Sequence, residues 1–128
     1  MGYPGIKALG FIREMDYAYA IADIVISRAG AITSAELAAV GKPVIFIPLP
    51  TAAENHQMKN AMAYEEKNAA IVIEDKQIKD KLPEILRDLV KDPSKRETLE
   101  RNIRKLAVTH ATEKICHEIM KLLNTEWN

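Results

Sequence analysis

The stretch SRAGAITSAELAAVGKPVIFIP, which runs from Ser27 to Pro48, decides the fold of this 128-residue chain. It begins at the end of one apolar run, passes through a turn of small residues into a helical segment, and ends in a second apolar run. Gly41 and Pro43 separate the helical segment from the second run, as expected where a helix ends and a strand begins. The stretch therefore predicts a strand–helix–strand unit with parallel strands and a right-handed crossover.

The same alternation continues on both sides of this unit. Most of the strand-like runs are nearly continuous in β-branched residues, which is typical of strands buried on both faces. The predicted strands are Ile6–Ile12, the weakest of them, Asp23–Ala29, Pro43–Leu49 and Ala69–Asp75, and the predicted helices are Met15–Ala22, Thr33–Val40 and Gln57–Lys67. The sequence therefore predicts one α/β domain, or part of one, with a parallel sheet of about four strands and flanking helices.

The last third of the chain is predicted to be helical. Asp92 and Pro93 have the residue types of an N-cap and a first helical position, and Ser94 with Glu97 offers a capping box nearby. Apolar residues at helical spacing predict three helices, with Leu82, Ile85, Leu86 and Leu89 in the first, Leu99, Ile103 and Leu106 in the second, and Ile115, Ile119, Leu122 and Leu123 in the last. The single cysteine, Cys116, falls in this pattern and is predicted to be a buried small hydrophobe.

The composition excludes several classes of function. Lys and Arg number 18, as do Asp and Glu, so the formal net charge is zero and gives no support to nucleic-acid binding. One cysteine excludes an internal disulfide framework and a multi-cysteine zinc site. No apolar run approaches the ~20 residues that span a bilayer, and the N-terminus carries no signal segment. We therefore predict a cytoplasmic protein that needs neither a metal nor a cofactor.

The turn inside the opening stretch is the first candidate site. It follows a predicted parallel strand, at the edge of the sheet where ligands bind. Gly30 allows a positive φ or a close approach of the backbone, and the helix start after it offers unpaired amides and the hydroxyls of Thr33 and Ser34 to a phosphate. Thr33 and Glu36 also fit a capping box, in which this turn only starts a helix. The local pattern leaves both interpretations open.

A second polar segment follows the third predicted strand. His56, Gln57 and Asn60 fall on the first turns of a helix at the same end of the sheet, and Glu54 and Asn55 precede them as predicted caps. The imidazole and amide groups suit hydroxyls or phosphate rather than a metal, or they form an ordinary polar helix start. A dinucleotide fingerprint and a P-loop are absent. No nucleophile–histidine–acid arrangement follows from the spacing, so no catalytic residue is predicted.

Three motifs make the chain recognisable, AYAIADIVISRAGAIT at 18–33, AAVGKPVIFIPLP at 38–50 and NHQMKNA at 55–61. Together they resemble the donor-binding half of the MurG family. That family transfers N-acetylglucosamine from its UDP derivative to lipid I, the undecaprenyl-linked precursor of peptidoglycan. The resemblance covers essentially the whole chain, and it implies a Rossmann-like fold, a partial C-terminal domain of the GT-B arrangement, and an inverting hexosyltransferase activity.

The resemblance also implies roles for individual residues in binding UDP-N-acetylglucosamine. The implied ligand contacts are Ile12, beside Phe11, for uracil, Ala31, Ile32 and Thr33 for the diphosphate, Glu36 for the ribose, and His56, Gln57 and Asn60 for the sugar. Arg28 belongs to the first motif but is assigned no ligand contact. The charge on the leaving diphosphate would be stabilised by a helix terminus rather than by a metal.

Two parts of the family's sequence have no counterpart in this chain. Nothing in it resembles the acceptor domain, or the opening strand and serine–glycine phosphate loop of the donor domain. Residues 1–128 are therefore interpreted as a partial UDP-sugar-binding domain that is inactive alone. Its partners would be an acceptor domain or subunit and a lipid-linked acceptor, with the full enzyme peripheral on the cytoplasmic face of the inner membrane. The strand Asp23–Ala29 would carry an unpaired edge, which predicts association of copies.

Two other interpretations are compatible with the same sequence. The chain could be an Alg13-like subunit, which is active only together with a separate membrane partner. It could also be a non-catalytic α/β module that has kept the fold and lost the ligand. Binding of UDP by the chain separates the second of these from the others.

Overall fold

The computed structural model describes residues 15–51 and 55–127, in which the chain forms a parallel sheet with helices on both faces. The strands are β1, Val25–Ser27, β2, Val44–Phe46, and β3, Ile71–Val72, in the order β1-β2-β3. In their register, Val25 lies opposite Val44, and Ile45 lies opposite Ile71. The predicted parallel α/β fold is confirmed, and the predicted strand Ile6–Ile12 lies outside the described residues.

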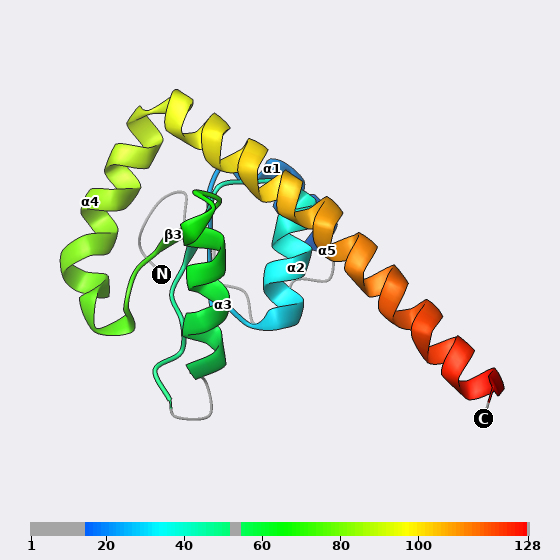
Figure 1. The fold of residues 1–128 in the computed structure, drawn as a ribbon. Helices are drawn as coiled ribbons and strands as arrows, with labels where there is room; N and C mark the ends of the chain where they lie inside the picture. The colour runs from blue at the N-terminus through cyan, green and yellow to red at the C-terminus, as the bar shows by residue number, and fades with distance from the viewer. Residues whose placement is uncertain (1–14, 52–54, 128) are drawn as a thin grey trace.

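Helices connect and flank the strands in the predicted alternation (Figure 1). They are α1, Met15–Ile21, α2, Ala31–Val40, α3, Asn55–Glu66, the 3-10 turn η1, Asp75–Gln77, α4, Ile78–Lys91, and α5, Pro93–Trp127. Both α2 and α3 start two residues earlier than predicted, at Ala31 and Asn55, so Asn55 is a helical residue and not a cap. Glu54, the other predicted cap, lies outside the described residues.

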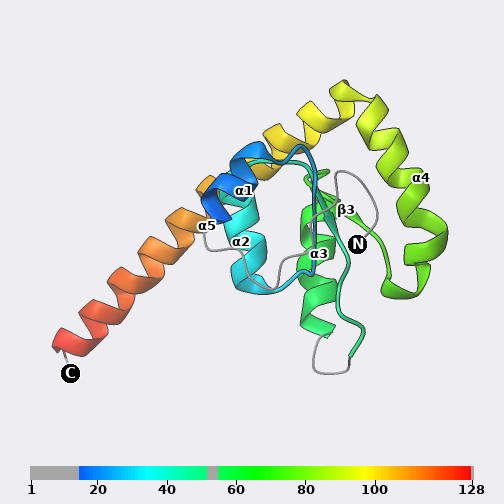
Figure 2. The same ribbon diagram turned by 180° about the vertical axis from the view of Figure 1, so that it is seen from behind.

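The alternation of side chains along β2, the central strand, divides the core into two layers. Val44 and Phe46 pack into the layer covered by α2 and α3. Ile45 and Ile47 pack into the other layer, where α4 contributes Leu89. In both views α4 lies on the opposite side of the strands from α2 (Figures 1 and 2). Because both faces of β2 are covered, its residues are all apolar and fully buried.

Gly41 ends α2, as the sequence predicts. Its φ of 75° lies in the left-handed region that favours glycine, and its N–H donates to the carbonyl of Leu37 at 3.1 Å. A Cβ at this position would run into the side chain of Arg104 on α5. The glycine therefore ends the helix and also lets α5 pack closely over that end.

Helix α5 is continuous, which corrects the prediction of two separate helices in this region. It starts as predicted, because Asp92 Oδ1 accepts a hydrogen bond from the Lys95 amide at 3.0 Å. No glycine or proline follows its first residue, so nothing in the sequence ends the helix early. Its first half bridges the two core layers, with Leu99 in the layer of α4 and Ile103 in that of α2.

The second half of α5 leaves the body of the domain, as both ribbon views show (Figures 1 and 2). Residues 116–123 are exposed there, including the apolar Ile119, Met120 and Leu122. The prediction that Cys116 is buried is therefore wrong. The apolar residues around Cys116 have the spacing of a helix face that packs on a core. At this point, however, α5 extends beyond the described elements that could cover that face.

Strand β1 pairs with β2 and with no other strand in the part of the chain that the structure describes. Ile26 of β1 is 43% exposed, and Ile21 at the end of α1 is 83% exposed. An edge of this kind can pair with another chain. The association of copies through this edge stays a prediction.

Candidate functional site

Helix α2 begins at Ala31, directly after the N-cap residue Gly30. Gly30 is extended, with φ −65° and ψ 149°, and it has no side chain that could cap the helix. Thr33 therefore lies in the first turn and Glu36 in the second. A capping box would need Thr33 at the N-cap, so the capping-box interpretation of these two residues is wrong. Alanine and isoleucine at 31–32 simply extend the helix back to the glycine.

The backbone at the start of α2 is open to a ligand. The N–H groups of residues 31–33 have no acceptor within the helix, whereas the Ser34 N–H donates to the Gly30 carbonyl at 2.9 Å. Gly30 does not adopt the positive φ that glycine allows, yet a Cβ built on it would meet nothing within 4 Å. The first turn carries no acidic residue. These amides therefore form the positive end of the helix dipole, an arrangement that suits an anion.

Ser34 is fully buried and is the centre of a hydrogen-bond network beneath the start of α2. Its hydroxyl donates to the Gly30 carbonyl at 2.5 Å and accepts from Asn60 Nδ2 at 2.5 Å. Asn60 Nδ2 also donates to the Ala29 carbonyl at 2.9 Å. The prediction that Ser34 offers its hydroxyl to a ligand is therefore wrong, because the group is used inside the protein. The network instead holds α3 against the start of α2.

The network continues to Tyr64 on α3, which gives it a testable dependence on pH. Burial raises the pKa of the Tyr64 phenol above its ordinary value of 10.0, and the hydrogen bond with Ser34 partly offsets this rise. The folded state thus holds the phenol proton more tightly than the unfolded state does. The resulting stabilisation is fully present below about pH 10 and is lost as the pH rises through the pKa of the folded state.

We expect Tyr64→Phe to lower the free energy of unfolding by about 0.5–1.5 kcal/mol at neutral pH, the usual net contribution of one hydrogen bond. Urea unfolding of both proteins across the pH range should show this difference shrinking above about pH 10. All other titratable groups are common to both proteins, so their contributions cancel in the difference. A difference that grows with alkaline pH would contradict the prediction.

Two hollows flank the start of α2. The first, of about 540 Å³, is lined by Ala29, Gly30, Ala31, His56, Gln57, Lys59 and Asn60. The hollow thus brings together four of the predicted ligand contacts, Ala31, His56, Gln57 and Asn60, of which the last three lie in the first turns of α3. Lys59 was not among the predicted residues, although its place three residues after His56 on a helix was a usable signal. It is exposed and adds a cation near the uncapped turn.

The second hollow, of about 470 Å³, runs along the exposed side of α2. It is lined by Ala31, Ile32, Ala35, Glu36 and Ala39. Ala31 lines both hollows, so the uncapped turn lies between the acid on one side and the imidazole and amides on the other. Thr33 is half-buried and lines neither hollow. Ile12 lies outside the described residues.

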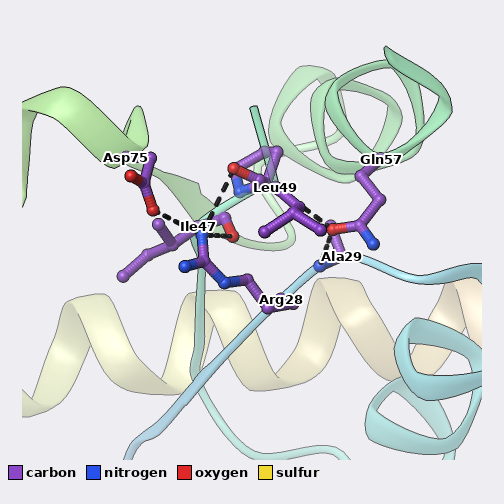
Figure 3. Close-up of polar contacts among 7 residues, drawn as sticks. Arg28, Ala29, Ile47, Leu49, Gln57 and Asp75 are labelled. Atoms are coloured by element: carbon purple, nitrogen blue, oxygen red, sulfur yellow. Dashed lines mark hydrogen bonds and ion pairs between the residues drawn. The ribbon is translucent and has the colours of Figure 1, made fainter. Parts of the chain in front are cut away.

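Polar side chains also tie together the carboxyl ends of the strands (Figure 3). Gln57 Oε1 accepts hydrogen bonds from the Ala29 amide at 3.2 Å and the Leu49 amide at 3.0 Å. Arg28, to which no ligand contact was assigned, instead forms an ion pair of 2.6 Å with Asp75. Of these contacts, the hydrogen bond between Gln57 and Ala29 joins two residues that line the first hollow.

Groups of three His, Cys, Asp or Glu side chains arranged to hold a metal ion do not occur within the described ranges 15–51 and 55–127. In the same ranges, no helix is both long enough and apolar enough to cross a membrane. The chemistry available at the start of α2 is therefore that of backbone amides, one carboxylate, one imidazole, side-chain amides and a lysine. Such a set can bind an anion next to hydroxyl groups.

Comparison with known proteins places the chain in a family. Residues 2–116 match the model of the glycosyltransferase family 28 C-terminal domain. The chain is 46% identical over 125 residues to a protein of Flavobacterium psychrophilum named UDP-N-acetylglucosamine--N-acetylmuramyl-(pentapeptide) pyrophosphoryl-undecaprenol N-acetylglucosamine transferase. This alignment covers 98% of the chain and 34% of the relative. A protein of the same name from Parabacteroides distasonis is 49% identical over 115 residues, which cover 89% of the chain and 31% of the relative.

A solved structure agrees with these relatives. The crystal structure of Acinetobacter baumannii MurG matches the chain with a TM-score of 0.73 and 30% sequence identity, over 90% of this chain and 33% of that one. The chain thus spans about a third of the length of the proteins it matches. Because the family model covers most of the sequence, the chain belongs to the glycosyltransferase family 28 C-terminal domains.

Proposed function

We propose that this chain is the UDP-N-acetylglucosamine-binding portion of a transferase that adds N-acetylglucosamine to lipid I in peptidoglycan synthesis. The observation that carries the proposal is the uncapped start of α2 between two hollows. The names of relatives more than 40% identical to the chain support the choice of donor and acceptor. Because the chain spans a third of those relatives, the acceptor-binding part of the enzyme would be supplied by further sequence or by a partner.

The two hollows fit the two ends of a nucleotide sugar. The diphosphate would lie on the amides of residues 31–33, where the helix dipole favours negative charge. The ribose would extend into the second hollow, where Glu36 can accept hydrogen bonds from its hydroxyls. The sugar would extend into the first hollow towards His56, Gln57 and Asn60. The resemblance assigns Ile12 to the uracil.

In the proposed reaction an acceptor hydroxyl attacks the anomeric carbon while the bond from that carbon to the UDP oxygen breaks. The configuration at the carbon inverts, and negative charge grows on the departing diphosphate. Amides at the start of α2 would stabilise that charge. Each contact of this kind contributes about 0.3–1 kcal/mol, and up to ~2 kcal/mol when partly buried. The acceptor would be lipid-linked, so the complete enzyme would work at the cytoplasmic face of the inner membrane.

Heteronuclear NMR titration of the 128-residue chain tests the proposal directly, because it detects weak binding and locates it. With millimolar UDP we expect shifts in the amides of Ala31, Ile32 and Thr33. UDP-N-acetylglucosamine should add shifts at His56 and Asn60 in α3. An absence of shifts with both ligands, or shifts confined to the opposite side of the domain, would reject the proposed function.

Replacing Glu36 with alanine should weaken UDP binding by about ten- to a hundredfold, because a hydrogen bond to a charged group contributes about 1.5–3 kcal/mol. The same change should leave the free energy of unfolding within about 0.5 kcal/mol of the wild type, since the side chain is exposed. Glu66→Ala, at an exposed position near the other end of α3, is the matched control and should change neither quantity. Unchanged UDP affinity in Glu36→Ala would remove this residue from the proposed site.

A further inference from the structure

A buried hydroxyl group lies directly behind one wall of the first hollow. Ser34 is the fourth residue of α2, is fully buried and lines neither hollow. Asn60 of α3 is half-buried and does line the first hollow. A hydrogen bond from Asn60 Nδ2 to Ser34 Oγ joins the two side chains. Ser34 can therefore act on a bound ligand through Asn60 without touching the ligand itself.

The partners of the Ser34 hydroxyl determine which atoms donate and which accept. A hydroxyl has one proton and two lone pairs, whereas a backbone carbonyl can only accept. The proton is directed to the Gly30 carbonyl, which lies 2.5 Å from Oγ, while the Ala31 carbonyl lies at 3.4 Å. The two lone pairs therefore accept from Asn60 Nδ2 and from the phenol of Tyr64, which also forms a hydrogen bond with Ser34.

The orientation of the Asn60 amide follows from the same accounting. Its Nδ2 donates one proton to the Ala29 carbonyl at 2.9 Å and the other to Ser34 Oγ. Since the Ala29 carbonyl has no proton to give, the amide atom beside it must be the nitrogen. Both protons of that nitrogen are used inside the protein. The polar atom that Asn60 can offer to the hollow is therefore Oδ1, an acceptor with two lone pairs.

The hydrogen bond to Ser34 is what fixes the amide plane. A bond to Ala29 alone would hold the nitrogen but would let the plane turn about it. We propose that Ser34 is a positioning residue, which holds the Asn60 amide with its oxygen available to the first hollow as an acceptor for a hydroxyl of the donor sugar. This inference rests on the proposed function, and it gives Ser34 a role one step away from the ligand.

Hydrogen exchange of the Asn60 side-chain amide, followed by NMR, tests the arrangement without any ligand. Ser34→Thr and Ser34→Val both add bulk at the buried site, but only threonine keeps a hydroxyl, which can still bond the carbonyl four residues earlier in a helix. We expect exchange at Asn60 Nδ2 to be about tenfold faster in Ser34→Val than in Ser34→Thr. Ser34→Ala, which removes the hydroxyl without adding bulk, should exchange as fast as Ser34→Val. Equal exchange in Ser34→Ala and the wild type would overturn the positioning role.

Titration with two ligands separates an effect on the sugar from an effect on the diphosphate. Ser34→Ala should weaken binding of UDP-N-acetylglucosamine by about two- to tenfold, the range for one hydrogen bond, and should leave UDP binding unchanged. Equal weakening of both ligands would mean that the hydroxyl acts on the start of α2 through Gly30, and the inference would be wrong. Unchanged affinity for both would also contradict it. A wild-type chain that responds to neither ligand rejects the proposed function, whereas the exchange measurement still decides whether Ser34 holds Asn60.

Tyr64→Phe is the control for a loss of stability alone. It removes the phenol that bonds to Ser34 and keeps both partners of the bond between Ser34 and Asn60. We expect it to retain slow exchange at the Asn60 side chain and the wild-type ratio of UDP-N-acetylglucosamine affinity to UDP affinity. If Tyr64→Phe changed this ratio as much as Ser34→Ala does, general loosening of the network would explain the effect, and the specific role of Ser34 would be rejected.

Discussion

Replacing Phe46 with alanine should lower the free energy of unfolding by about 3–5 kcal/mol, as is usual when a buried aromatic side chain is truncated. Phe46 ends the central strand β2 and has no exposed surface. Its ring packs against the ring of Tyr64 on α3, with 5.5 Å between centroids. The substitution therefore removes apolar burial and leaves a cavity between β2 and α3 that the surrounding core cannot easily fill.

The loss is large compared with the total stability of a small domain, which is about 5–15 kcal/mol. Urea unfolding followed by circular dichroism measures it, with Val90→Ala as the control. Val90 lies on α4, is 58% exposed, and should cost less than about 0.5 kcal/mol when truncated. A cost for Phe46→Ala below about 1 kcal/mol would mean that the layer between β2 and α3 is not packed as described.

The elements that could be predicted are those whose signals are local. The β-branched runs around Val44 and Ile71 became parallel strands, as such runs favour when both faces pack into a core. The residues of β2 are buried, and Ile71 and Val72 of β3 are partly buried against the two opposite core layers. Gly41 and Asp92 marked helix ends correctly, since each acts through its own backbone or side-chain geometry. The strands are shorter than the apolar runs, because only part of each run forms hydrogen bonds with a neighbouring strand.

The errors came from features that depend on neighbouring elements. Thr33 has the residue type of an N-cap, but the helix had already begun at Ala31, so its position could not be read from the motif alone. Ser34 was expected to face a ligand, yet Asn60 on another helix engages its hydroxyl. Cys116 has apolar neighbours at helical spacing, but α5 projects beyond the elements that would bury it.

The order of predicted strands and helices placed the turn before α2 and the polar start of α3 at the same end of the sheet. Local pattern left both as ambiguous features, and only the resemblance to a family implied a ligand for them. The contacts between the strand ends could not be predicted, because they span 28 residues between Ala29 and Gln57 and 47 residues between Arg28 and Asp75. Those distances along the chain close only once the order of the strands is known.

The second large effect is expected from Leu37→Ala, which should lower the free energy of unfolding by about 2–5 kcal/mol. Leu37 is 1% exposed and packs from α2 into the same core layer as Phe46 and, on α5, Ile103. It is adjacent to Glu36, which faces solvent on the same helix. The two neighbours therefore separate the stability of α2 from its proposed ligand contact.

Comparing Leu37→Ala with Glu36→Ala tests the proposed site more strictly than either variant does alone. Thermal or urea unfolding should show a large loss for Leu37→Ala and almost none for Glu36→Ala, because helix propensity favours alanine at both positions and only Leu37 loses burial. UDP titration of the folded fraction should show the opposite order, with Glu36→Ala binding more weakly. If both changes destabilised α2 equally, the face carrying Glu36 would be packed against the protein, and the second hollow could not receive a ribose.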